Sequence, residues 1–175
     1  IDELAARGIV FRNAYAQSPK TGYSMPSLYT GIYPSNIERG SKCPKVPGKK
    51  GYHWCVGDGT RLTAEDFNKR GYSTALFCRF PFFERQRLDR GMDTAVYGKE
   101  STRKVPGWIQ DDEEPFFLVV HMPFPHHPYD QHREFHFGSR SIDGYDSEIA
   151  YSDAQVGRIV KRIKRKGMLD KTVFI

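Results

Sequence analysis

The chain has 175 residues, of which 38% are hydrophobic and 14% aromatic, and its formal net charge is +6. This length and this apolar content suit one ordinary folded domain and exclude an intrinsically disordered chain. No apolar run approaches the roughly 20 residues that a membrane-spanning helix needs, so we expect no membrane span here.

The first residues alternate short elements with turns. Residues 1–7 are predicted to be the end of a helix, and residues 9–11 a short strand. Ser24 is of a residue type that caps helix N-termini, and it precedes Pro26 in a predicted helix that ends at Gly31.

The segment 35–60 is rich in Gly, Pro and Lys and lacks hydrophobic periodicity, which predicts a long loop. Two of the three cysteines, Cys43 and Cys55, lie in it, and the third is Cys78. Cys43 and Cys55 would form a disulfide in an exported protein and could equally remain free thiols. Neither has a neighbouring CxxC partner, so the cysteines do not predict a zinc site.

The remaining elements predict an α/β fold. An amphipathic helix over 62–70 precedes a strand over 72–78, and a long helix is expected over 143–166. The strand over 115–121 is almost continuously apolar, so we expect it to lie in the interior of the sheet. A last strand is expected over 172–175. Alternating helices and strands imply a mostly parallel central sheet flanked by helices, in one domain over 1–175.

Four segments of this sequence resemble the sulfatase family of the alkaline phosphatase superfamily. They are residues 8–34, with the end "PSLYTGIYP"; residues 62–77; residues 116–129, "FFLVVHMPFPHHPY"; and residues 145–158, "YDSEIAYSDAQVGR". The resemblance covers nearly the whole chain. It implies an alkaline-phosphatase-like fold and an internal, incomplete catalytic domain. The protein is then expected outside the cytoplasm, by this resemblance alone.

The resemblance places a nucleophile at the start of the helix that ends at Gly31. Counting back from this glycine, the family spacing reaches Thr21, whereas a second register makes Ser24 the modified residue of an "S-x-P-S" motif. Sulfatases convert a Cys or Ser there to formylglycine, which Thr cannot form. Family members that transfer phosphoryl groups use Thr directly. Thr21 is favoured over Ser24 as the nucleophile, and both remain candidates. Ser24 and the neighbouring Lys20 are also candidate substrate-binding residues.

Histidines are the other candidates. His121 is the last residue of the apolar strand, at the end where α/β proteins place ligands, and it can donate to an ester oxygen or protonate a leaving group. The resemblance adds His126 as catalytic and His127 as a substrate-binding residue. This sequence departs from the family pattern at Phe124, which stands where the family has an acidic residue expected to support His126.

Several charged residues receive a weaker interpretation. Arg79 could contact an anionic substrate, but a surface charge is the stronger reading, and Glu148, Tyr151 and Asp153 are expected to pack and support the site. The basic run 161–166 is interpreted as a solvated helix end, so we expect no nucleic-acid partner. The acidic run 111–114 is expected to solvate a loop.

The resemblance implies a hydrolase or transferase acting on sulfate or phosphate esters of small molecules, glycans or lipids. The resemblance implies a divalent metal in the intact protein, either calcium or zinc, manganese or magnesium. Thr21 is the one metal ligand recognised, because the family's paired Asp segment and its "S/T-D-H-G" segment are absent from this sequence. We therefore expect no tight metal binding by these 175 residues alone. The alternative function is an inactive sulfatase-like binding module.

Overall fold

A central parallel sheet organises the computed structural model, which describes residues 1–44, 54–109 and 115–175. The strands are β1 (Ser73–Cys78), β2 (Thr94–Tyr97) and β3 (Phe116–His121), in the order β2-β1-β3. Both strand pairs are parallel. Parallel neighbours require a crossover between strands, and helices supply it here.

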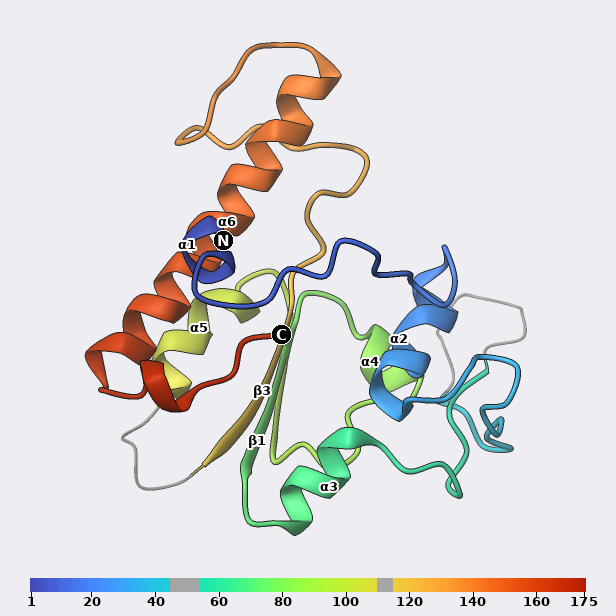
Figure 1. Cartoon of the computed structure of the whole chain (residues 1–175). Coiled ribbons are helices and arrows are strands. Elements are labelled where there is room, and N and C mark those ends of the chain that lie inside the picture. Colours follow the sequence, from blue (N-terminus) through green and yellow to red (C-terminus); the bar gives the residue numbers. More distant parts are fainter. Residues whose placement is uncertain (45–53, 110–114) are drawn as a thin grey trace.

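Helices cover both faces of this sheet (Figure 1). Their bounds are α1 (Asp2–Ala5), α2 (Thr21–Thr30), α3 (Thr63–Lys69), α4 (Phe82–Arg85), α5 (Ser101–Trp108) and α6 (Ser141–Arg165), followed by a 3₁₀ helix (Leu169–Lys171). On one side of the sheet lie α2, α3 and α4, and on the other lie α5 and α6. The predicted α/β arrangement with a parallel sheet and flanking helices is confirmed.

Strand β1 divides the core between the two layers because its side chains alternate across the sheet. Leu76 and Cys78 pack into the cluster that includes Phe83 of α4. Ala75 and Phe77 point the other way and pack into the cluster that includes Ile163 of α6. Both faces of β1 are therefore dry, and the strand anchors the two helical layers to each other.

The predicted interior position of residues 116–120 is wrong for the part of the chain that the structure describes. There β3 pairs with β1 alone and forms an edge of the sheet, and its residues are only partly buried. Its continuous apolarity has another cause. Phe117 stacks on Phe67 of α3, while Leu118 and Val120 pack in the α5–α6 cluster. Helices on both faces make a strand apolar whether or not it has a strand neighbour on each side.

Two other predicted strands are absent from the described residues. Residues 9–11 and 172–175 have no strand partner, and their apolar side chains are mostly exposed. Apolar residues of this kind form a strand only where a sheet edge is available to them. The short elements β2, α4 and α5 and the 3₁₀ helix Leu169–Lys171 were not predicted. Helix α5 contains Pro106 and Gly107, which obscure a helical pattern.

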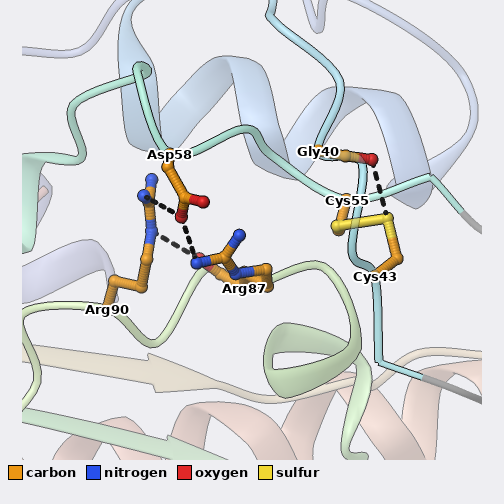
Figure 2. The surroundings of a disulfide bond; sticks show 6 residues. All are labelled: Gly40, Cys43, Cys55, Asp58, Arg87 and Arg90. Atoms are coloured by element: carbon orange, nitrogen blue, oxygen red, sulfur yellow. Dashed lines mark hydrogen bonds and ion pairs between the residues drawn. A yellow bond between two sulfur atoms is a disulfide. The ribbon is translucent and has the colours of Figure 1, made fainter.

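The segment 35–60 is described in part, since residues 45–53 lie outside the described residues. Cys43 and Cys55 form a disulfide with a Cα–Cα distance of 5.4 Å (Figure 2). A Cβ at Gly40 would lie 2.8 Å from Cys55 Sγ, so glycine permits the chain to pass beside the bridge. Next to it, Asp58 pairs with Arg87 and Arg90, which ties this segment to the chain after α4.

We expect reduction of the disulfide to lower the free energy of unfolding by about 3 kcal/mol, because the bridge restricts the unfolded chain across a short loop. The cysteines are separated by 12 residues. Urea denaturation with and without dithiothreitol measures the change. The double variant Cys43→Ser/Cys55→Ser is the control and should not respond to the reductant. An unchanged wild-type midpoint after reduction would contradict the pairing.

The basic end of α6 has a structural role in part. The Arg162 guanidinium donates twice to the carbonyl oxygen of Ile109, at 2.9 and 3.2 Å, and joins α6 to the end of α5.

The acidic run 111–114 lies outside the described residues. Within the described ranges, no helix combines the length and the apolarity that crossing a membrane requires.

Candidate active site

Helix α2 begins at Thr21, so the prediction that Ser24 caps this helix is wrong. Lys20 is the N-cap in an extended conformation, and its carbonyl oxygen accepts from the N–H groups of Tyr23 and Ser24, each at 3.0 Å. Ser24 therefore lies inside the first turn. The N–H groups of Thr21 and Gly22 precede the first helical hydrogen bonds, which leaves them available to an anion.

Gln86 allows α2 to contain a proline. Pro26 has no N–H, so the carbonyl oxygen of Gly22, four residues earlier, loses its usual helical donor. The Gln86 side-chain amide donates to this oxygen at 2.8 Å. Gln86 follows α4, and α4 follows the carboxyl end of β1, so this contact holds the amino end of α2 toward that edge of the sheet. Figure 1 shows the amino end of α2 and the carboxyl ends of β1 and β3 facing the same way.

Glu148 of α6 anchors the loop that follows β3. Its side chain is fully buried, and its carboxylate accepts from the backbone N–H of His126 at 2.9 Å and of Asp130 at 3.1 Å. One turn away, a Cβ at Gly144 would lie 3.2 Å from Tyr129 Cβ, so glycine lets the loop approach the helix closely. The expected supporting role of Glu148 thus takes a definite form, because it shapes the backbone that carries His126.

A pocket of about 180 Å³ lies between this loop and the end of β1. Its walls are formed by Arg79, Phe80, Pro123, Phe124, His126, His127, Pro128, Asp130 and Glu148. The Arg79 guanidinium lies over the rings of Phe80, at 5.6 Å, and Phe124, at 5.1 Å. A cation held between aromatic rings next to histidines can receive an anionic group.

The tautomer of the neutral His126 ring follows from one contact. Its Nδ1 lies 2.7 Å from the carbonyl oxygen of His127, which can only accept, so Nδ1 carries the proton. In the neutral ring Nε2 is then a hydrogen-bond acceptor, and the ring donates from Nε2 only when it is protonated. His127 packs edge-to-face on Tyr129 with ring centres 5.8 Å apart.

His121 lies deeper, at the carboxyl end of β3. Its Nδ1 is 3.3 Å from Cys78 Sγ, and its ring packs against Phe83 with centres 5.1 Å apart. Burial lowers the pKa of this imidazole below its ordinary value, so the neutral ring is favoured. Phe83 also contacts Tyr29 of α2 at 5.3 Å, which connects His121 through packed rings to the helix of Thr21.

The structure brings some of the predicted site residues together in one pocket. His126 and His127 form the wall of one pocket, together with Arg79, which the sequence analysis had assigned to the surface. Among the described contacts, none joins Thr21, Lys20 or Ser24 to His121 or His126, the two histidines predicted to be catalytic. Their convergence stays a prediction. Arg79 directly follows β1, and its place at the carboxyl end of a buried strand is the signal that could have identified it.

The described residues do not supply a metal-ligand set. In the three described ranges, no group of three or more His, Cys, Asp or Glu side chains is placed to hold a metal ion. Thr21 alone could offer one hydroxyl oxygen, and a hard cation needs several oxygen ligands. The described residues therefore do not fit a metal by themselves, and the expectation that these 175 residues alone bind no metal tightly stays a prediction.

Comparison with known proteins identifies relatives of the chain. The family model described as Sulfatase matches residues 1–175. A curated relative, "Uncharacterized sulfatase YdeN" of Escherichia coli (strain K12), is 27% identical over 212 residues, covering 97% of this chain and 35% of the relative. The chain thus spans about a third of that relative's length.

Solved structures agree on the fold. The crystal structure of Ps i-CgsB in complex with k-i-k-neocarrahexaose superposes with a TM-score of 0.72 at 19% identity, over 95% of this chain and 49% of that one. A Bacteroides thetaiotaomicron protein, BT33494S-sulf, from work on the metabolism of multiple glycosaminoglycans, gives 0.70 at 18% identity, over 95% and 50%. The fold is alkaline-phosphatase-like. Because the family model matches the whole sequence, the chain belongs to the sulfatase family.

Proposed function

We propose that the full-length protein hydrolyses sulfate esters at the edge of the sheet where β1 and β3 end. The observation that carries this proposal is the pocket lined by Arg79 and His126, beyond the carboxyl end of β1. The amino end of α2 faces the same way as the carboxyl ends of β1 and β3 (Figure 1). A sulfate ester presents oxygens with shared negative charge, and a guanidinium and free helix N–H groups can hold them. Membership of the sulfatase family supports this reaction.

In the proposed reaction the Thr21 hydroxyl oxygen bonds to sulfur as the bond to the leaving oxygen breaks. The hydroxyl proton passes to water, and protonated His126 donates from Nε2 to the leaving oxygen. Water then cleaves the sulfate from Thr21. Sulfatases usually require a divalent metal. No step of this proposal passes through it, since the described residues do not form its site.

Thr21 itself favours a second candidate, hydrolysis or transfer of phosphate esters. Its side chain cannot become the formylglycine aldehyde, whereas an unmodified hydroxyl can accept a phosphoryl group directly. Location outside the cytoplasm belongs to the same proposal and is supported by the Cys43–Cys55 disulfide, since such bridges persist in oxidising compartments. We also propose that residues 1–175 are part of a single catalytic domain.

Assays of the full-length protein with 4-nitrophenyl sulfate and 4-nitrophenyl phosphate test the proposal. Calcium, magnesium, manganese and zinc are each supplied and then removed with a chelator. Turnover of the sulfate supports the first candidate, and turnover of the phosphate alone supports the second. Neither substrate being cleaved under any metal, while a sulfated oligosaccharide still binds, would reject both in favour of the inactive binding module.

We further propose that the ester belongs to a glycan. Rings run from the pocket along the loop: His127 packs on Tyr129, and Tyr129 packs on Tyr145 at 5.3 Å. An open groove of about 400 Å³ continues from there, between Tyr129, Ser141, Ile142 and Tyr145. Aromatic faces with hydroxyl groups suit a sugar ring, which has apolar faces and a polar rim. The names of both solved structures described above mention saccharides, one a bound neocarrahexaose and the other glycosaminoglycans, which supports this class of substrate.

Tyr145→Ala is expected to raise KM about fivefold for a sulfated oligosaccharide, because one aromatic contact of order 1 kcal/mol is lost. Turnover of 4-nitrophenyl sulfate, which does not reach the groove, should stay unchanged. Tyr145→Phe keeps the ring and should retain most of the affinity. Exposed Tyr33 offers a matched control in Tyr33→Ala. Equal losses for both substrates would contradict a sugar contact at this groove.

A further inference from the structure

Cys78, the last residue of β1, lies directly beside His121, the last residue of β3. The parallel register pairs these two residues, and Cys78 is fully buried. Its Sγ lies 3.3 Å from His121 Nδ1 and 3.0 Å from the carbonyl oxygen of Phe80. A thiol carries a single proton, so Cys78 can donate to only one of these two neighbours.

The contact with Phe80 determines where that proton lies. A carbonyl oxygen cannot donate, and sulfur and oxygen only 3.0 Å apart would repel each other without a hydrogen between them. Burial raises the pKa of the Cys78 thiol to about 11, so this hydrogen is present at neutral pH. The thiol therefore donates to Phe80, and the proton in the contact with His121 must come from Nδ1.

We propose that Cys78 is a positioning residue that holds His121 in the Nδ1–H tautomer and leaves Nε2 as an unprotonated acceptor. Phe83 packs edge-to-face on the same ring and restricts its rotation. The catalytic meaning of this tautomer rests on the proposed function. In that site, His121 accepts a proton or a hydrogen bond through Nε2. It does not bind an ester oxygen as a cation.

The surroundings of the pair are consistent with neutral groups. Two titratable side chains on neighbouring elements, Tyr29 of α2 and Tyr97 of β2, interact electrostatically with Cys78. Burial raises the pKa of both phenols, so both are uncharged at neutral pH. The Tyr97 hydroxyl donates to the Asp89 carboxylate at 3.0 Å, so this carboxylate is paired with a neutral phenol. His121 therefore keeps its neutral ring, and the tautomer is determined by Cys78.

Nitrogen NMR of the full-length protein labelled at histidine tests the proposal, with the His121 signals identified by their loss in His121→Gln. In the wild type we expect a protonated Nδ1 and an unprotonated Nε2. Cys78→Ala should shift the tautomer ratio toward Nε2–H by about fivefold, the equivalent of one neutral hydrogen bond. Cys78→Ser, whose hydroxyl can also accept and donate, should keep the wild-type tautomer.

Two results would overturn the proposal: a predominantly Nε2–H ring in the wild type, or an unchanged ratio in Cys78→Ala. If Cys78→Ala does not fold, the wild-type and Cys78→Ser spectra still decide it. The readout needs no turnover. An Nδ1–H ring together with full ester turnover in His121→Gln would support the tautomer and show that ester cleavage does not need this ring.

Discussion

Replacing Thr21 with Ala is expected to lower ester turnover by about 10³-fold or more, whereas replacing Ser24 with Ala should leave most of it. Thr21 is the first residue of α2, beside N–H groups that the helix does not use. Ser24 lies inside the first turn, with its own N–H bonded to Lys20. A nucleophile cannot be replaced by a methyl group, and a thousandfold loss corresponds to about 4 kcal/mol of barrier.

Steady-state kinetics of the full-length variants measure this difference. Thr21→Ser is the matched control, because it keeps the hydroxyl and removes only a methyl group, and it should retain turnover. Mass spectrometry after rapid quenching should detect the sulfated or phosphorylated residue at position 21. A modified Ser24 in the wild type, or a loss in Ser24→Ala as large as in Thr21→Ala, would instead assign the nucleophile to the second register.

Glu148→Ala is expected to lower the free energy of unfolding by about 4 kcal/mol and to disorder the loop of His126. The buried carboxylate accepts two backbone N–H groups, from His126 and Asp130. Hydrogen bonds to a charged acceptor contribute about 1.5–3 kcal/mol each, and their loss leaves both donors without this partner. Urea denaturation measures the total, and faster amide exchange at these two residues localises it.

Glu148→Gln tests whether both carboxylate oxygens matter. The amide keeps the shape and one accepting oxygen, so one of the two backbone donors should stay protected, and the loss should be about half. The exposed Glu134, on the same loop, provides Glu134→Ala as a control with little expected effect. Equal stability of Glu148→Ala and the wild type would show that the loop is held by other contacts.

Local sequence alone was sufficient to predict the elements that have a long hydrophobic pattern or a clear terminating residue. The helix of α3 and the strand of β1 were predicted to within a residue at each end, and α6 to within two. Their periodicity and their following glycines depend only on neighbours along the chain. The sulfatase resemblance, carried by motifs that span the chain, also pointed to the family and to the loop that carries His126.

Tertiary contacts decided what these patterns could not. In α2 the carbonyl oxygen of Gly22, which Pro26 leaves without a helical donor, accepts from Gln86, a residue distant in sequence. The edge position of β3 follows from strand pairing, which apolarity on both faces does not reveal.

The same holds for the candidate site. The bridge between Cys43 and Cys55 was left open by the sequence, and Arg79 was assigned to the surface. Cys78 received no role until β1 and β3 paired in register and placed it beside His121. Residue type and spacing report on neighbours along the chain, whereas a pocket or a hydrogen-bonded pair depends on which distant segments the fold brings into contact.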